Sequence, residues 1–239
     1  MATFTALYDS CVLYPAPLRD SLMRLALTDL FRARWTDRIH DEWIGALLKA
    51  RPDLDRQKLE RTRSLMNASV RDCLVTGYEA LIDALKLPDP DDRHVLAAAI
   101  RTRAHVIVTF NLTDFPAAYL AQFGMHAQHP DEFITHLLDL APGAVCVAAK
   151  RQRAALKNPP KTVDEFLSAL ARQHLPRRWR SQSTSAAIGR TWLSRIGSHP
   201  FAVRGRKRIS SWMSGARCSR FMICVTRARV TWPSRATSA

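Results

Sequence analysis

Short apolar runs alternate with longer segments of helical periodicity over the first 140 residues, and this alternation restricts the possible folds more than any other feature of the sequence. The runs at 4–8, 105–109 and 125–127 are apolar or β-branched, as buried strands are. Apolar residues recur at helical spacing in six segments: 18–31, 41–50, 54–70, 92–103, 116–123 and 130–140. Strands that alternate with helices predict a three-layer α/β/α fold, with helices on both faces of a central parallel sheet.

A second part begins after Pro142-Gly143, where the α/β pattern ends. Residues 144–156 and 162–172 contain two further helical patterns. Thr162 and Glu165 have the spacing of a capping box that begins the second of these helices. The sequence thus predicts three parts: an α/β domain at 1–140, a small helical extension at 141–176 and a basic tail at 177–239.

The net charge of +15 is carried almost wholly by that tail. Residues 1–176 contain 22 Lys+Arg against 21 Asp+Glu, whereas residues 177–239 contain 14 Lys+Arg and no acid. The tail also has eleven serines and four of the six tryptophans, without sustained periodicity. We expect it to be poorly ordered and to come from a shifted reading frame, a change that enriches Arg, Ser and Trp in GC-rich genes. The alternative is a basic arm that binds nucleic acid.

Composition excludes several classes of protein. No apolar run approaches the roughly 20 residues of a membrane helix, and the N-terminus lacks the basic region of a secretory signal. The five cysteines are odd in number and form no CxxC pair, which favours a reduced, cytoplasmic chain. Ser10 lacks the context of a hydrolase nucleophile, no glycine-rich loop is present, and the histidines lack zinc-site spacing to cysteine.

Four acidic residues lie where predicted strands end or predicted helices begin: Asp9, Glu42, Asp92 and Asp114. Each alone also fits a turn or a helix cap. Because the carboxyl ends of parallel strands meet at one edge of a sheet, we expect the four to lie together. Clustered carboxylates repel one another unless cations neutralise them, and hard oxygen ligands select Mg²⁺ or Mn²⁺ over zinc.

Two segments carry a more specific pattern, Asp89-Pro-Asp-Asp-Arg-His-Val-Leu-Ala-Ala-Ala-Ile and Val106-Ile-Val-Thr-Phe-Asn-Leu-Thr-Asp-Phe-Pro. They contain the forms Asp-x-x-(Ile/Val)-x-Ala and Thr-x-(Asn/Asp)-x-x-Asp-Phe. Asp9 with Ser10, and Glu42 after Asp41, fit the first strand and the second acid of the same pattern. Together these motifs resemble those of the PIN-domain ribonucleases, over about residues 4–135.

The resemblance implies a PIN-like fold at 1–140 and a metal-dependent endoribonuclease, often the toxin of a type II toxin–antitoxin pair of the VapC kind. It implies Mg²⁺ or Mn²⁺ as the cofactor. The implied partners are RNA, a cognate antitoxin and a second copy of the chain. Residues 155–170 also look like the C-terminal extension of one subgroup of these proteins.

The resemblance assigns metal binding and catalysis to Asp9, Glu42, Asp92 and Asp114. A metal-activated water would attack the phosphorus, and the metal would offset the charge that develops. The residues expected to orient the ligands or the phosphate are Ser10, Thr109 and Asn111.

Asn111 is a departure from the family pattern, because many members have an aspartate at this position. Whether Asn111 or Asp114 faces the metal is open, and Asp89 and Asp91 are rival or outer candidates beside Asp92. Two other functions also remain open: an inactive PIN-fold module that binds RNA or an antitoxin, and a DNA-directed nuclease of the same fold.

Overall fold

Four short parallel strands form the centre of the computed structural model, which describes residues 4–171. The sheet order is β2-β1-β3-β4, with β1 (Thr5–Tyr8) and β3 (Val106–Val108) inside and β2 (Arg32–Arg34) and β4 (His126–Gln128) at the edges. All three strand pairs are parallel. β1 and β3 are buried along their whole length, as strands covered on both faces must be.

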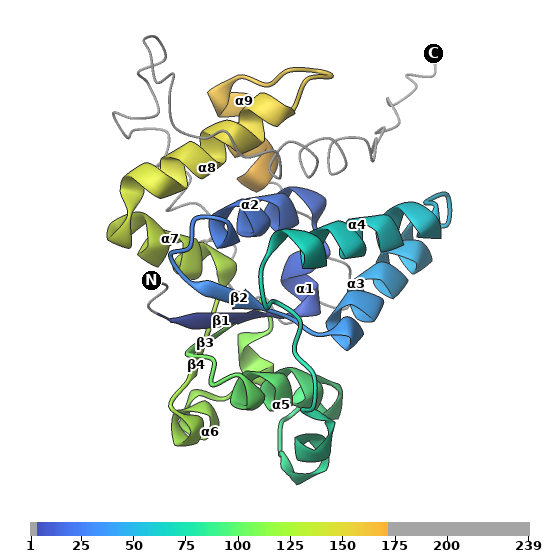
Figure 1. Ribbon diagram of the computed structural model, residues 1–239, viewed down its shortest axis with the longest axis vertical. Helices are drawn as coiled ribbons and strands as arrows, with labels where there is room; N and C mark the ends of the chain where they lie inside the picture. The colour runs from blue at the N-terminus through green and yellow to red at the C-terminus, as the bar shows by residue number, and fades with distance from the viewer. Residues whose placement is uncertain (1–3, 172–239) are drawn as a thin grey trace, which may run out of the picture.

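Helices cover both faces of this sheet (Figure 1). One face carries α5 (Arg93–Arg101) and α6 (Ala117–Leu120), drawn below the strands. The opposite side carries the remaining α-helices: α1 (Ser10–Leu13), α2 (Ala16–Ala26), α3 (Asp37–Ala50), α4 (Arg56–Ser69), α7 (Pro130–Leu140), α8 (Pro142–Ala155) and α9 (Val163–Ala171). The three-layer α/β/α fold predicted from the sequence is therefore confirmed.

Short 3₁₀ segments complete the described chain: η1 (Glu79–Ala84), η2 (Pro90–Asp92), η3 (Leu112–Asp114) and η4 (Ala121–Phe123). None of the helices between residues 4 and 171 is both long and apolar enough to cross a membrane.

Aromatic side chains fill the space between β1 and α7. The ring of Phe133 lies edge-on to those of Tyr8 and Phe31, with centroids 6.3 and 5.1 Å away. Phe31 also stacks on Phe4. Burying each such side chain contributes about 1.5–3 kcal/mol, so this cluster fixes α7 against the sheet.

Side-chain caps determine where two of the helices that border the sheet edge begin. Thr36 accepts a hydrogen bond from the amide of Ile39, so α3 starts at Asp37 rather than at the predicted residue 41. Asp9 caps α1 by accepting from the amide of Ser10, which joins the end of β1 directly to a helix.

The predicted helix at 18–31 is too long. The structure ends α2 at Ala26 and, after five intervening residues, forms the edge strand β2. The strand has only three residues and buries only Ala33 between two arginines, so it has no apolar run to reveal it. Its position follows from pairing with β1, a tertiary contact that local periodicity does not encode.

The C-terminal helices pack on the α/β fold. Gln152 of α8 is buried, donates to the Pro17 carbonyl at 2.8 Å and accepts from the Ser21 hydroxyl at 2.7 Å, both on α2. The Thr162–Glu165 capping box is present, with reciprocal bonds of 2.8 and 3.2 Å. The division into domains stays a prediction, and the tail at 177–239 lies outside the described residues.

Candidate metal centre

The carboxyl edge of the sheet collects the acids predicted from the sequence. Asp9 follows β1 directly, and Asp114 closes η3 just beyond β3. Asp92 ends η2 at the start of α5, where Pro90 begins the turn and Asp89 caps it by accepting from the Asp91 amide. Three separate stretches of chain therefore bring carboxylates to one place.

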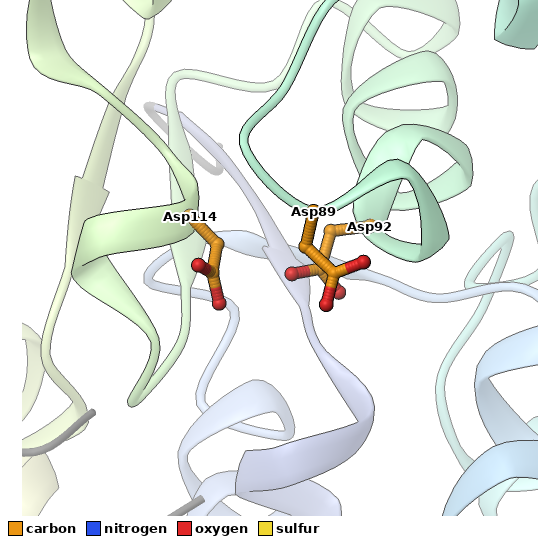
Figure 2. A group of neighbouring side chains, drawn as sticks. All are labelled: Asp89, Asp92 and Asp114. Carbon is orange, nitrogen blue, oxygen red and sulfur yellow. The ribbon is translucent and has the colours of Figure 1, made fainter. Parts of the chain in front are cut away.

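Asp89, Asp92 and Asp114 form the tightest group. Each offers an oxygen, and these oxygens all lie within 4.8 Å of one another. Figure 2 shows the carboxylates of Asp89 and Asp92 side by side, with that of Asp114 across from them. Asp114 is buried, and the other two are half-buried. A spacing this short among partly desolvated anions is unfavourable unless protons or a cation neutralise them.

Asp92 is the electrostatic centre of the site. Burial, together with the negative charges of Asp9, Asp89, Asp114 and Glu42, raises the pKa of Asp92 to about 8. All four of the other acids thus act on one carboxyl group, including two that lie outside the tightest group.

Two oxygens at this edge fit a hard cation. Oδ2 of Asp92 and Oδ1 of Asn111 are buried and have no hydrogen-bond partner among the described residues. Buried polar atoms without a partner are rare and costly in folded proteins. Carboxylate and amide oxygens are the donors that Mg²⁺ and Mn²⁺ prefer, so the residues present suit such an ion.

Asp9 is held rigidly beside this group. Its Oδ2 accepts from the Thr109 hydroxyl at 2.7 Å and from the Cys11 thiol at 3.0 Å, and its Oδ1 accepts from the Ser10 amide. Thr109 also accepts from the Asn111 amide at 3.0 Å. The end of β3 is therefore tied to the end of β1 through the Asp9 carboxylate.

Glu42 comes from α3, next to the fully buried Trp43. Its Oε1 lies 2.8 Å from Nε2 of His94 and 3.5 Å from Nε of Arg38. Burial alone would raise the pKa of Glu42, but His94, Ser10 and Arg38 together hold it below its ordinary value. The two carboxyl groups therefore differ: the pKa of Glu42 is lowered, whereas that of Asp92 is raised.

The structure brings the predicted site residues to one edge of the sheet but divides them. Asp92 and Asp114 lie together with Asp89, which the sequence left as a rival or outer candidate beside Asp92. Asp9 and Glu42 act on Asp92 through charge from positions beside the group. Ser10 and Thr109 both donate hydrogen bonds to Asp9, and their orienting role stays a prediction. Asp91 is exposed.

Sequence reasoning missed His94 and Cys11 as members of this site. A histidine inside an apolar helix face, and a cysteine two residues after Asp9, are both ordinary core residues when seen in sequence alone. The signal available in the sequence was their spacing: Cys11 lies two residues after Asp9, and His94 lies two residues after Asp92.

The chain is similar to known proteins in two regions. Residues 5–113 match the family described as "PIN domain", and residues 130–178 match the family described as "VapC50 C-terminal domain". Four of the acids lie within the first match, and Asp114 follows it directly.

A relative from Mycobacterium tuberculosis (strain ATCC 25618 / H37Rv), named "Putative ribonuclease VapC50", is 43% identical over 97 residues. The aligned part is 41% of this chain and 57% of the relative, so the chain matches little more than half of that protein. No solved structure matches the chain.

Proposed function

Because this chain belongs to the PIN-domain family and is VapC-like, we propose that it is a metal-dependent endoribonuclease that hydrolyses RNA phosphodiester bonds. The observation that carries the proposal is the convergence of Asp89, Asp92 and Asp114 within 4.8 Å, where the charges of Asp9 and Glu42 also act on Asp92. The name of the mycobacterial relative supports the same reaction class.

Mg²⁺ or Mn²⁺ would be held by Asp89, Asp92 and Asp114, with Asp9 and Glu42 as the further catalytic acids. When bound, such an ion activates water and offsets the charge that develops on a phosphodiester. This assignment adds Asp89 to the four residues that the sequence pointed to, since its oxygen lies within 4.8 Å of those of Asp92 and Asp114.

The surrounding residues of the chain have definable tasks in this reaction. Ser10 and Thr109 fix both oxygens of Asp9, so that carboxylate cannot turn away from the site. Asn111 presents a buried amide oxygen that has no partner between residues 4 and 171, while its backbone amide is fixed on Thr109. This side chain is placed to orient a ligand or a phosphate.

RNA cleavage by the full chain tests the proposal. We expect a labelled RNA mixture to be cut with Mg²⁺ or Mn²⁺ and left intact with EDTA. Asp92→Asn should lower the rate by at least about a hundredfold, since it removes the central carboxylate of a unit whose members act together. Asp83→Asn, the same change on an exposed aspartate of η1, is the matched control and should cut at the parent rate.

Parallel samples with single-stranded DNA distinguish a ribonuclease from the two alternatives, a DNA-directed nuclease and a binding module. Cleavage of DNA in preference to RNA would identify a DNA-directed nuclease. A protein that binds Mn²⁺ and RNA but cuts neither RNA nor DNA would be a binding module. RNA cleavage by Asp92→Asn at the parent rate would overturn the site assignment.

In the cell we propose that the chain acts in the cytoplasm as the toxin of a type II toxin–antitoxin pair, working as a homodimer. Its partners would be the RNA substrate and a cognate antitoxin. Induced expression should then arrest growth of a bacterial host, and Asp92→Asn should abolish the arrest. Arrest by the Asp92 variant at equal protein level would argue against nuclease toxicity.

A further inference from the structure

Glu42 reaches the acidic edge from the opposite helical layer to Asp92. It lies on α3, above the sheet in Figure 1, whereas Asp92 stands at the head of α5, below it. The contact between His94 of α5 and Glu42 of α3 therefore bridges the two layers across the end of the sheet, at 2.8 Å.

The same oxygen of Glu42 has two competing basic neighbours. His94 approaches Oε1 from the buried side, and its side chain is only 1% exposed. Arg38, one helical turn before Glu42 on α3, approaches Oε1 at 3.5 Å with a side chain that is 47% exposed. Contact with His94 therefore favours a buried position of the carboxylate, whereas contact with Arg38 favours an exposed position on α3.

His94 stands out within its own helix. Residues 94–99 of α5 are all buried, and His94 is the one polar side chain among them. Burying an imidazole costs free energy unless a polar partner compensates for it. Neither ring nitrogen meets hydrogen-bond geometry with any residue from 4 to 171. The 2.8 Å contact between Nε2 and the Glu42 carboxylate is therefore the polar contact that compensates for burial of the ring.

The register of α5 links this pair to the acidic group. His94 follows Asp92 by two residues, so one helix start supplies both the central carboxylate and the group that holds Glu42. Glu42 in turn adds its negative charge to those that surround Asp92. A shift of Glu42 toward Arg38 would remove one negative charge from the surroundings of Asp92.

We propose that His94 is a positioning residue, which holds the Glu42 carboxylate at the acidic edge and thereby sets the affinity of the site for divalent cations. The inference rests on the proposed metal-dependent function. Partners that hold metal-site residues from outside typically change metal affinity by 10–100-fold when they are removed. The same size of effect is expected here.

Mn²⁺ binding to the full chain, measured by titration calorimetry without RNA, tests the inference. His94→Leu keeps an apolar side chain of similar size but cannot pair with Glu42, and we expect it to weaken Mn²⁺ binding by about tenfold or more. His94→Gln places an amide near the position of Nε2 and should stay within about threefold of the parent. Arg38→Gln is the control on the exposed side and should bind at least as tightly as the parent.

A double-mutant cycle separates positioning from general damage to the fold. If His94 acts through Glu42, then His94→Leu in a Glu42→Gln background should change Mn²⁺ affinity by less than about twofold. Thermal melts by circular dichroism show which variants are folded. If His94→Leu does not fold, His94→Asn, whose amide is too short to reach Glu42, replaces it.

The outcomes distinguish the inference from the proposed function. If the parent chain binds no Mn²⁺ and cuts no RNA, the proposed function fails. If the parent binds Mn²⁺ and His94→Leu binds equally well, or loses the same affinity with and without the Glu42 carboxylate, the positioning role is wrong while the function stands.

Discussion

At the scale of single residues, the environment of Asp92 is unfavourable for a charged carboxylate. Its carboxyl group is partly buried, has an oxygen without a partner among the described residues, and is surrounded by four other acids. Folding alone does not favour such an arrangement, since replacing ionised carboxylates by neutral groups would relieve the repulsion. Residues that oppose stability in this way are typical of functional sites.

The raised pKa of Asp92 predicts how the stability of the fold depends on pH. The pKa of Asp92 is raised to about 8 from its ordinary value of 3.8, so the folded chain keeps a proton that the unfolded chain has already released. Between these two values the folded state binds more protons, and the contribution of Asp92 to stability therefore falls as the pH rises from about 4 to about 8.

Asp92→Asn should remove this contribution. In EDTA, its melting temperature should exceed that of the parent chain by a margin that grows from pH 5 to pH 8, reaching on the order of 5 °C. Melts monitored by circular dichroism at four pH values measure the margin. A margin that shrinks with rising pH would contradict the raised pKa.

At the scale of elements, the buried Gln152 joins α8 to α2. Its amide satisfies the Pro17 carbonyl and the Ser21 hydroxyl at once. The sequence indicated the helix but not its docking, because a lone glutamine on a weakly amphipathic segment gives no sign of its partner 131 positions away. The edge strand β2 was not predicted either, because its position depends on a partner strand, β1, that is distant in the sequence.

Gln152→Ala should destabilise the chain by about 1–3 kcal/mol, because it leaves buried polar groups on α2 with fewer partners. Urea unfolding at constant slope measures the change. Gln57→Ala, at an exposed position of α4, is the matched control and should change stability by less than about 0.5 kcal/mol. Equal effects of both changes would show that α8 does not depend on this contact.

At the scale of the whole molecule, the candidate metal centre joins segments from both helical layers and from two strands. A cation bound there should therefore stabilise the complete fold rather than one loop. By mass action, ligand at 100 times its dissociation constant adds about 2.7 kcal/mol to the stability of the state that binds it.

Mn²⁺ at saturating concentration should accordingly raise the melting temperature of the parent chain by on the order of 5 °C. The shift should be absent in Asp92→Asn and unchanged in Asp83→Asn. An equal shift in Asp92→Asn would mean that the cation binds elsewhere on the chain.

The sequence by itself determined the fold class, and it indicated which acids to consider. Both signals are local: buried strands are continuous apolar runs, helices repeat every 3.6 residues, and the motifs around Asp92 and Asp114 lie within single elements. The helix at 130–140 was predicted with its observed bounds. The existence of β2 was not predicted, since a three-residue edge strand is defined by its partner.

Only the tertiary structure decided how the acids are arranged. The approach of Asp89 to Asp92 and Asp114, and the contact of His94 with Glu42, depend on where η2 and α5 lie relative to β3 and α3. Such distances are set by packing between residues that are far apart in the chain: Asp92 and Asp114 are 22 positions apart, and Glu42 and His94 are 52 positions apart. Electrostatic coupling falls with distance through space and not with separation along the chain, so the order of the residues indicated the chemistry while the fold fixed its geometry.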